Sequence, residues 1–325
     1  MNKFCQYSLI ALFATSFSAV HAQYFSGQTS YWKSQRHSFG IGLGASFFLG
    51  EPGGRDQIGT DFIYDLELSK TKPALQFTYR YQLGSRFYIK AQLAYAIIGG
   101  NDALTEEIFR RNRNLSFRSN IFEFSLQGEY DLIDFTQKTR YGRIKQSKLE
   151  GSALYISAGV GVTRFNPQGN FEGTWYDLRD FGTEGQLQDG GPSQYSLYTV
   201  VIPLGIGYRM QLNKEWTVGF EIVHRLTFTD YMDDVSTVYF DNQTIADNQG
   251  ELAAIFADPS LGYYVDENGL RVPLGSTEAG LQRGNPNKND AYFFGMFTAD
   301  YKIAQKRFKR GRGRVTKRRR RRVVF

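Results

Sequence analysis

Few residues in this sequence could act as a nucleophile, a general base or a metal ligand. The 325 residues include one cysteine, Cys5, and three histidines, His21, His37 and His224. Hydrolases and acyltransferases need a base, most often histidine, beside a nucleophile or carboxylate. His224 lies in an apolar row of an alternating segment and His37 lies at the start of another, and neither has an obvious Ser–Asp partner. The sequence therefore predicts structural histidines, no cofactor and no enzymatic activity.

An acidic cluster is the other candidate for chemistry. Asp230, Asp233 and Asp234 lie within FTDYMDDVS, where an alternating segment ends. Carboxylates this close in sequence could bind Ca²⁺. EF-hand spacing is absent, however, and polar clusters are common where a strand leaves a membrane. We expect no resident metal, and the alternative roles are a solvated cluster or one that pins a loop.

Basic residues gather in two segments that could bind an acidic partner. The first is the stretch 134–150 and the second is the C-terminal tail, KRFKRGRGRVTKRRRRRVVF. Without the twelve cations of the tail, 27 basic residues face 32 acidic ones, so the net charge of +7 describes an acidic body with a cationic end. Such a dense run of like charge is expected to be disordered alone. The candidate partner-binding residues are Lys138, Arg140, Arg143, Lys145, Lys148, Lys306, Arg307, Lys309, Arg310, Arg312, Arg314, Lys317, Arg318, Arg319, Arg320, Arg321 and Arg322.

The first residues resemble an export signal. Lys3 precedes a short apolar stretch, Ser8 to Val20, and Val20-His21-Ala22 fits a cleavage site. The stretch is too short to span a bilayer. We expect residues 1–22 to be a signal peptide and 23–37 a short N-terminal segment. Export argues against nucleic-acid binding or nuclear import by the basic tail, whose remaining alternatives are a periplasmic anion or no dedicated partner.

The elements that must position these residues are alternating segments. Apolar and polar residues alternate with period two, as in β-strands, over eight stretches: 38–49, 74–83, 87–97, 122–132, 152–165, 196–211, 215–228 and 291–303. Three of these have small residues such as Gly40, Ser157 and Gly207 on one face, which leaves room for long side chains from other strands. Each is long enough for a tilted transmembrane strand.

The polar face of these segments distinguishes a membrane barrel from a soluble sandwich. It includes Arg80, Lys90, Glu123, Glu129, Arg209, Glu221 and Arg225. Charged groups are costly in a sandwich core but can pair inside a small membrane barrel. The predicted fold is an all-β, eight-stranded antiparallel outer-membrane β-barrel over residues 38–304, followed by a disordered basic tail at 305–325.

Connection lengths predict the orientation. Gly84-Ser85 and Asn213-Lys214 are tight turns, whereas the connections 50–72, 99–115, 166–195 and 229–290 are long. Short periplasmic turns and long extracellular loops are typical of outer-membrane barrels, so both termini and the basic tail should be periplasmic. An eight-stranded barrel is filled by its side chains or holds one small ligand, so it is no diffusion pore. Within the last loop, ELAAIFAD (251–258) favours a short helix.

Several segments in order also resemble a known family. They are RNLSFRSNIFE (113–123), FNPQG (165–169), FGTEGQ (181–186), YSLYTVVIPLGIGYR (195–209), WTVGFEIVHRLTFTDYMDDVS (216–236) and QRGNPNKNDAYFF (282–294). Together they resemble the PorG family, the outer-membrane barrel subunit of the type IX (Por) secretion system of Bacteroidetes. The resemblance covers about residues 38–303 and leaves the basic tail outside.

The resemblance implies a scaffold that anchors a periplasmic ring, formed by PorK- and PorN-like proteins, to the outer membrane. It further implies a role in protein export and, where present, gliding motility. Its partners would be outer-membrane lipids and the ring proteins, with no nucleic acid and no small-molecule substrate. The alternatives are an OmpA-like structural barrel, a surface adhesin that acts through its extracellular loops, and a barrel enzyme.

Overall fold

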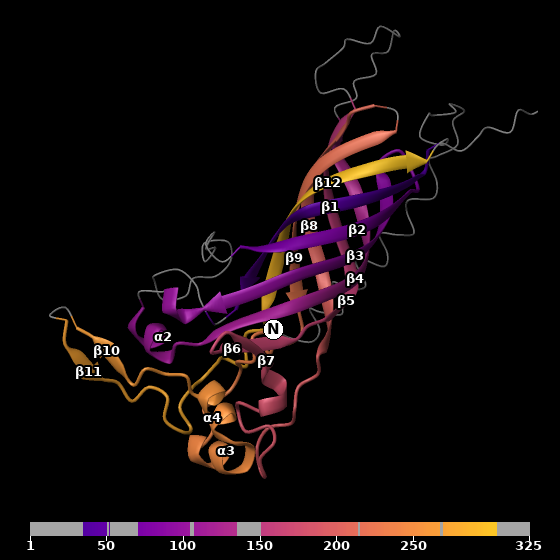
Figure 1. The fold of residues 1–325 in the computed structure, drawn as a ribbon. Coiled ribbons are helices and arrows are strands. Elements are labelled where there is room, and N and C mark those ends of the chain that lie inside the picture. The colour runs from indigo at the N-terminus through magenta and orange to yellow at the C-terminus, as the bar shows by residue number, and fades with distance from the viewer. Residues whose placement is uncertain are drawn as a thin grey trace, which may run out of the picture.

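Eight antiparallel strands close into a barrel (Figure 1). The computed structural model describes residues 35–50, 52, 71–104, 107–134, 151–213, 215–266 and 269–303. The barrel strands are β1 (His37–Leu49), β2 (Lys72–Gln82), β3 (Phe87–Asn101), β4 (Ser116–Asp134), β5 (Ser152–Arg164), β8 (Tyr198–Gln211), β9 (Trp216–Thr227) and β12 (Ala291–Ile303). Each pairs with its neighbour in sequence, and β1 pairs with β12 to close the ring. The predicted fold class is confirmed.

The faces of the strands also follow the prediction. Outward side chains such as Phe77, Leu93 and Phe297 are exposed and apolar, while the predicted inward charges are buried or nearly so. This apolar exterior around a polar interior is the arrangement of an outer-membrane barrel. The predicted small inward residues make room for larger ones: a Cβ on Gly207 would meet the Tyr155 ring, and one on Gly40 would meet the Asp300 carboxylate.

The two ends of the barrel differ. At one end lie the tight turns before Phe87 and Trp216, together with the start of β1 and the end of β12 (Figure 1). We call this the turn end. At the other end, the loop end, β3 and β4 run further than predicted, to Asn101 and from Ser116, because their backbones stay paired beyond the apolar belt. The predicted loop 99–115 is correspondingly shorter.

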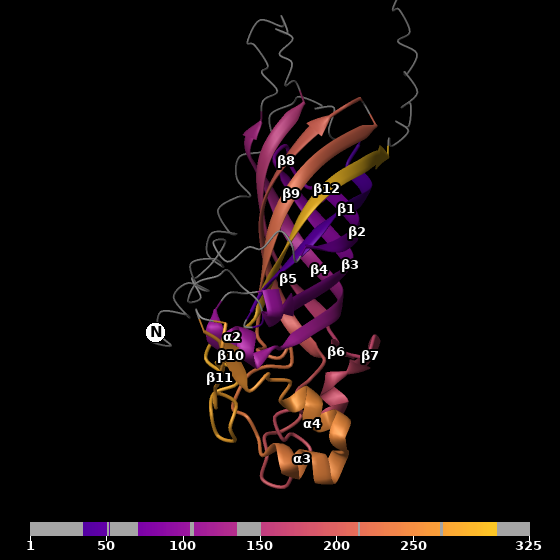
Figure 2. The same ribbon diagram turned by 60° about the vertical axis from the view of Figure 1, so that its left-hand side comes forward.

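The long connections at the loop end fold into a cap (Figures 1 and 2). The cap comprises the described parts of 102–115, 166–197 and 229–290. Its elements are η5 (Asp102–Leu104), α2 (Ile108–Arg113), β6 (Pro167–Phe171), β7 (Thr174–Asp177), η6 (Leu178–Phe181), α3 (Asn242–Gln249), α4 (Glu251–Ala257), β10 (Tyr263–Val265) and β11 (Arg271–Pro273). Within the described residues, none of the helices is long and apolar enough to cross a bilayer.

The helices of the cap include one that was predicted. The structure confirms the helix expected at 251–258, which is α4. The preceding helix α3 was not predicted, because NQTIADNQ is rich in residues that favour turns and has a weak apolar face. Asp241 caps α3 by accepting a hydrogen bond from the Thr244 backbone N–H at 2.9 Å. Neighbouring α4 contributes most of the buried side chains of the pair.

One hydrophobic core joins the cap to the barrel. Ile98, Ile121 and Phe294 fill the loop end of the barrel interior and belong to the same buried cluster as Leu178 and Phe256 of the cap. A cap that shares a core with the barrel cannot move without exposing apolar surface to water. The connections at the loop end are therefore a packed layer over the barrel mouth.

Candidate functional site

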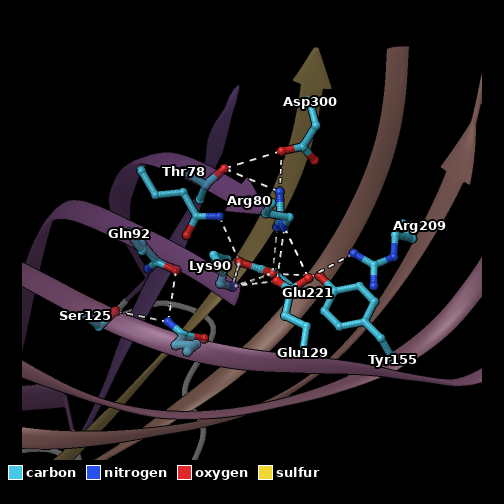
Figure 3. A network of polar contacts seen from close by, with 12 residues as sticks. Thr78, Arg80, Lys90, Gln92, Ser125, Glu129, Tyr155, Arg209, Glu221 and Asp300 are labelled. Atoms are coloured by element: carbon cyan, nitrogen blue, oxygen red, sulfur yellow. Dashed lines mark hydrogen bonds and ion pairs between the residues drawn. The ribbon is translucent and has the colours of Figure 1, made fainter. Parts of the chain in front are cut away.

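A network of ion pairs crosses the turn-end half of the barrel interior (Figure 3). Glu129 on β4 lies at its centre, 3.0 Å from Arg80 Nε, 3.4 Å from Lys90 Nζ and 2.9 Å from Arg209 Nη1. Arg80 also pairs with Asp300 on β12, across the barrel from Glu129. These links join strands on opposite walls, so the network holds the barrel interior closed.

Glu221 on β9 is the second carboxylate of the network (Figure 3). It lies 3.1 Å from Lys90 Nζ and accepts hydrogen bonds from the Tyr155 hydroxyl at 2.7 Å and from Gln76 Nε2 at 2.8 Å. All four side chains are buried. A buried carboxylate needs such partners, because its desolvation is otherwise not compensated.

The charges of the barrel interior balance. Among the buried and half-buried inward side chains of the described strands, five cations meet five anions: Arg80, Lys90, Arg209, Arg225 and Lys302 against Glu123, Glu129, Asp131, Glu221 and Asp300. Lys72 is on the same face of β2 but is exposed at the loop end. Arg225 pairs with Glu123 at 3.1 Å and stacks 3.8 Å from the Phe294 ring centre. Between this pair and the loop end, Ile98, Ile121 and Phe294 form an apolar layer, beside smaller buried polar side chains such as Ser119 and Thr163. The barrel is thus filled by side chains, as expected for eight strands.

A second buried cluster holds the cap together. Its centre is Glu184, Asp234 and Arg283, which we call the cap node. Arg283 Nη1 lies 3.1 Å from Glu184 and donates to the Asp234 backbone carbonyl at 2.6 Å. Glu184 also accepts from the Ser236 backbone N–H at 2.8 Å and the Thr237 hydroxyl at 2.7 Å. The cap node therefore ties the connection 166–197 to two distant parts of the connection 229–290.

The predicted acidic cluster belongs to this arrangement. Asp234 accepts hydrogen bonds from the Thr183 hydroxyl at 2.5 Å and the Tyr195 hydroxyl at 2.6 Å, and Asp233 accepts from the Val235 backbone N–H at 3.0 Å. Asp230 is buried as well. The interpretation as a solvated cluster is wrong, because these carboxylates are enclosed, and the loop-pinning alternative describes Asp234.

The calcium interpretation gains no support from this geometry. In the part of the chain that the structure describes, no group of three or more His, Cys, Asp or Glu side chains is placed to hold a metal ion. Both oxygens of Asp234 face hydroxyl donors, which compete with a cation for the same lone pairs.

Burial raises the pKa values of Asp234 in the cap node and of two tyrosines beside it. Desolvation raises the pKa of Asp234 to about 6, although Arg283 and the two hydroxyl donors oppose the shift. Desolvation and the neighbouring Asp234 raise the pKa of Tyr195 well above its usual range, so its hydroxyl remains a donor. Burial and Glu184 raise the pKa of Tyr231 to about 12.

The raised pKa of Asp234 predicts a pH-dependent cap. The folded cap binds this proton up to about pH 6, whereas the unfolded chain releases it near the ordinary value of 3.8. The free energy of cap opening should therefore fall, by on the order of 3 kcal/mol, as the pH rises from about 4 to 6. Hydrogen exchange across this range should show that slope in the wild type and a flatter one in D234N.

Asp241 provides the control for this measurement. It is exposed at the start of α3, and asparagine caps a helix as well as aspartate does. D241N should keep the wild-type slope. An equal slope in wild type and D234N would show that Asp234 does not carry the pH dependence.

The other candidate residues lie apart from both clusters or outside the described residues. His37 Nδ1 hydrogen-bonds the Tyr79 hydroxyl at 2.7 Å at the turn end, and His224 lies half-buried on the outer face of β9. The structure does not bring the two histidines together. The basic residues of 134–150 and 306–325, from Lys138 to Arg322, lie outside the described residues, as does the predicted signal peptide.

Sequence reasoning missed Glu184 and Arg283 as functional partners. Both stand in segments already singled out, FGTEGQ and QRGNPNKNDAYFF. The available signal was a single charge within a glycine-rich loop segment, which is compatible with a solvated turn as well as with a buried contact.

Residues 21–250 match the profile of the Domain of unknown function (DUF6089) family. The chain belongs to the DUF6089 family. The match spans the barrel strands from β1 to β9, together with Glu184 and Asp234 of the cap node, while Arg283 and β12 lie beyond it. No curated protein matches the chain in sequence.

Three solved barrels are similar to this DUF6089 protein at low identity. They are Ail of Yersinia pestis (8% identity, TM-score 0.35, covering 83% of this chain and 99% of Ail), Neisserial surface protein A (6%, 0.36, 82% and 97%) and a major outer membrane protein from Thermus thermophilus (9%, 0.36, 82% and 99%). Identities this low carry no information about the function of the DUF6089 protein.

Proposed function

We propose that this protein is a non-conducting outer-membrane anchor for the periplasmic ring of a type IX secretion system. The observation that carries the proposal is the filled barrel interior, in which ion pairs and an apolar layer occupy the path from end to end. A filled barrel acts through its surfaces, and the sequence resembles the PorG family, whose members act as such anchors. Two histidines apart from each other also favour a structural role over a catalytic one.

In this proposal the turn end faces the periplasm. Outer-membrane barrels have their short turns on that side. His37 and Ile303, the outer ends of β1 and β12, lie at the turn end, so the chain before β1 and after β12 leaves the barrel there (Figure 1). The basic segments 134–150 and 306–325 would then meet the ring, and their charge would attract an acidic ring surface.

Deletion of residues 306–325 is expected to reduce recovery of PorK- and PorN-like proteins severalfold when the barrel is purified from detergent. The reason is loss of twelve cations, and the wild-type interaction should weaken steeply with salt. Quantitative mass spectrometry of the co-purified proteins measures both effects.

A glycine–serine tail of equal length is the matched control for that deletion. It restores length without charge and should recover as little ring protein as the deletion. Full recovery with the neutral tail would contradict the electrostatic contact, and absence of ring proteins from the wild-type preparation at low salt would contradict the anchor itself.

A second candidate function is a surface role, as an OmpA-like structural barrel or an adhesin. The cap favours it, because its loops form an ordered layer with its own buried node at the loop end. Ring recovery distinguishes the two: an adhesin would bind its target through the cap and bring down no ring proteins.

A further inference from the structure

The outer surface of the barrel carries two charged residues, both near its loop end. Among the described barrel-strand residues whose side chains face outward, Arg118 on β4 and Arg164 on β5 are the arginines, and no lysine or carboxylate accompanies them. The other outward positions are apolar, aromatic, small or uncharged polar residues and two histidines. Both arginines lie at the loop end, on adjacent strands.

Their depth coincides with the edge of the apolar belt. Arg164 is opposite Phe122 on β4 and Tyr198 on β8, and it follows Val162 on the outer face of β5. Phe122, Val162 and Tyr198 are 51%, 49% and 62% exposed, as lipid-facing side chains are. Arg164 therefore lies at the boundary between the acyl chains and the headgroups of the surrounding leaflet.

Arg118 lies further from the belt and is held in place. Its guanidinium stacks 3.9 Å from the Trp175 ring centre on β7, and its Nε donates to Gln168 Oε1 at 3.0 Å. Gln168 in turn donates to Asp177, the nearest carboxylate in this chain of contacts, at 2.7 Å. Within the described residues Arg118 makes no hydrogen bond through its terminal amino groups and neither arginine forms an ion pair.

We propose that Arg118 and Arg164 bind the phosphates of an anionic lipid in the leaflet at the loop end. Guanidinium groups bind phosphate through paired hydrogen bonds, and the stacked Arg118 has lost part of its side-chain freedom before binding. The neighbouring belt of Phe122, Val162 and Tyr198 would receive the acyl chains. With the turn end facing the periplasm, as proposed above, this leaflet is the outer one, and the occupant is a phosphorylated glycolipid such as lipid A. The inference rests on that orientation and not on the secretion role.

The test uses the full chain in mixed micelles, with bisphosphorylated lipid A as the probe. Native mass spectrometry measures the fraction of protein that retains lipid A as its concentration rises. The double variant R118Q/R164Q should bind roughly thirtyfold more weakly than the wild type, because each basic residue near an anionic lipid surface contributes a few-fold to affinity. Dephosphorylated lipid A should bind wild type and variant alike.

A matched variant and a folding readout keep the result interpretable. R86Q/R271Q removes two exposed arginines away from this edge, one at the turn end and one on β11, and should bind as the wild type does. Heat-modifiable mobility in gels reports that each barrel is folded. Equal retention of lipid A by the wild type and R118Q/R164Q would overturn the proposal. Displacement of lipid A by millimolar inorganic phosphate would also overturn it, because the site would then bind phosphate without a contribution from the acyl chains.

Discussion

Replacing Glu221 with glutamine is expected to destabilise the barrel by about 3–5 kcal/mol. The change leaves the buried Lys90 ammonium with Glu129, 3.4 Å away, as its remaining ion-pair partner. It also leaves the enclosed interior with an unbalanced positive charge, since the ten buried and half-buried inward charges of the wild type cancel. Removing one partner from a buried pair is costly because the other charge stays desolvated. Reversible urea unfolding in micelles, followed by tryptophan fluorescence, measures the loss.

The double variant K90M/E221Q tests the cause of that loss. It restores neutrality, and methionine retains much of the lysine stem's volume, so it should be clearly more stable than E221Q. E215Q is the control for removal of a carboxylate, because Glu215 is exposed just before β9. A cost below about 1 kcal/mol for E221Q, or no recovery in the double variant, would contradict a stabilising ion network.

The barrel could be predicted from sequence because the alternation within each strand shows which side chains face inward and which face outward. Side chains alternate across a strand, so Phe77 and Arg80 fall on opposite faces whatever the rest of the chain does. Which inward charges meet depends on the stagger of the closed barrel. Glu129 meets Arg80, Lys90 and Arg209 from three other strands, and a linear pattern contains no record of that stagger.

The cap could not be predicted for a different reason. Glu184 and Arg283 are 99 residues apart, and both stand in loops without periodicity. Asp234 looked like a rim carboxylate because its partners, Thr183 and Tyr195, lie in another connection. The apolar face of a helix such as α4 can be recognised from its local sequence. A charged residue in a loop can be recognised as buried only when its counter-charge is known.

Replacing Arg283 with methionine is expected to open the cap and leave the barrel folded. The variant leaves Glu184 and Asp234 buried without the described cation that separates them, at a cost of about 3–5 kcal/mol. At pH 7.5, residues 178–191 and 229–266 should lose protection from hydrogen exchange and become sensitive to protease. The barrel strands should keep their protection, because Arg283 makes none of the contacts of the barrel network.

Acid should partly reverse this opening. The positive charge of Arg283 lowers the pKa of Asp234, which burial otherwise raises, so its removal raises that pKa further above about 6. Protonation at pH 5 then removes one of the two buried charges and restores part of the protection. R271M, which changes an exposed arginine on β11, should leave the cap closed at both pH values. Full protection of R283M at pH 7.5 would mean that the shared apolar core is enough to hold the cap closed. If the variant opens and pH 5 does not reduce the opening, Arg283 acts by packing, because only a charge effect responds to protonation of Asp234.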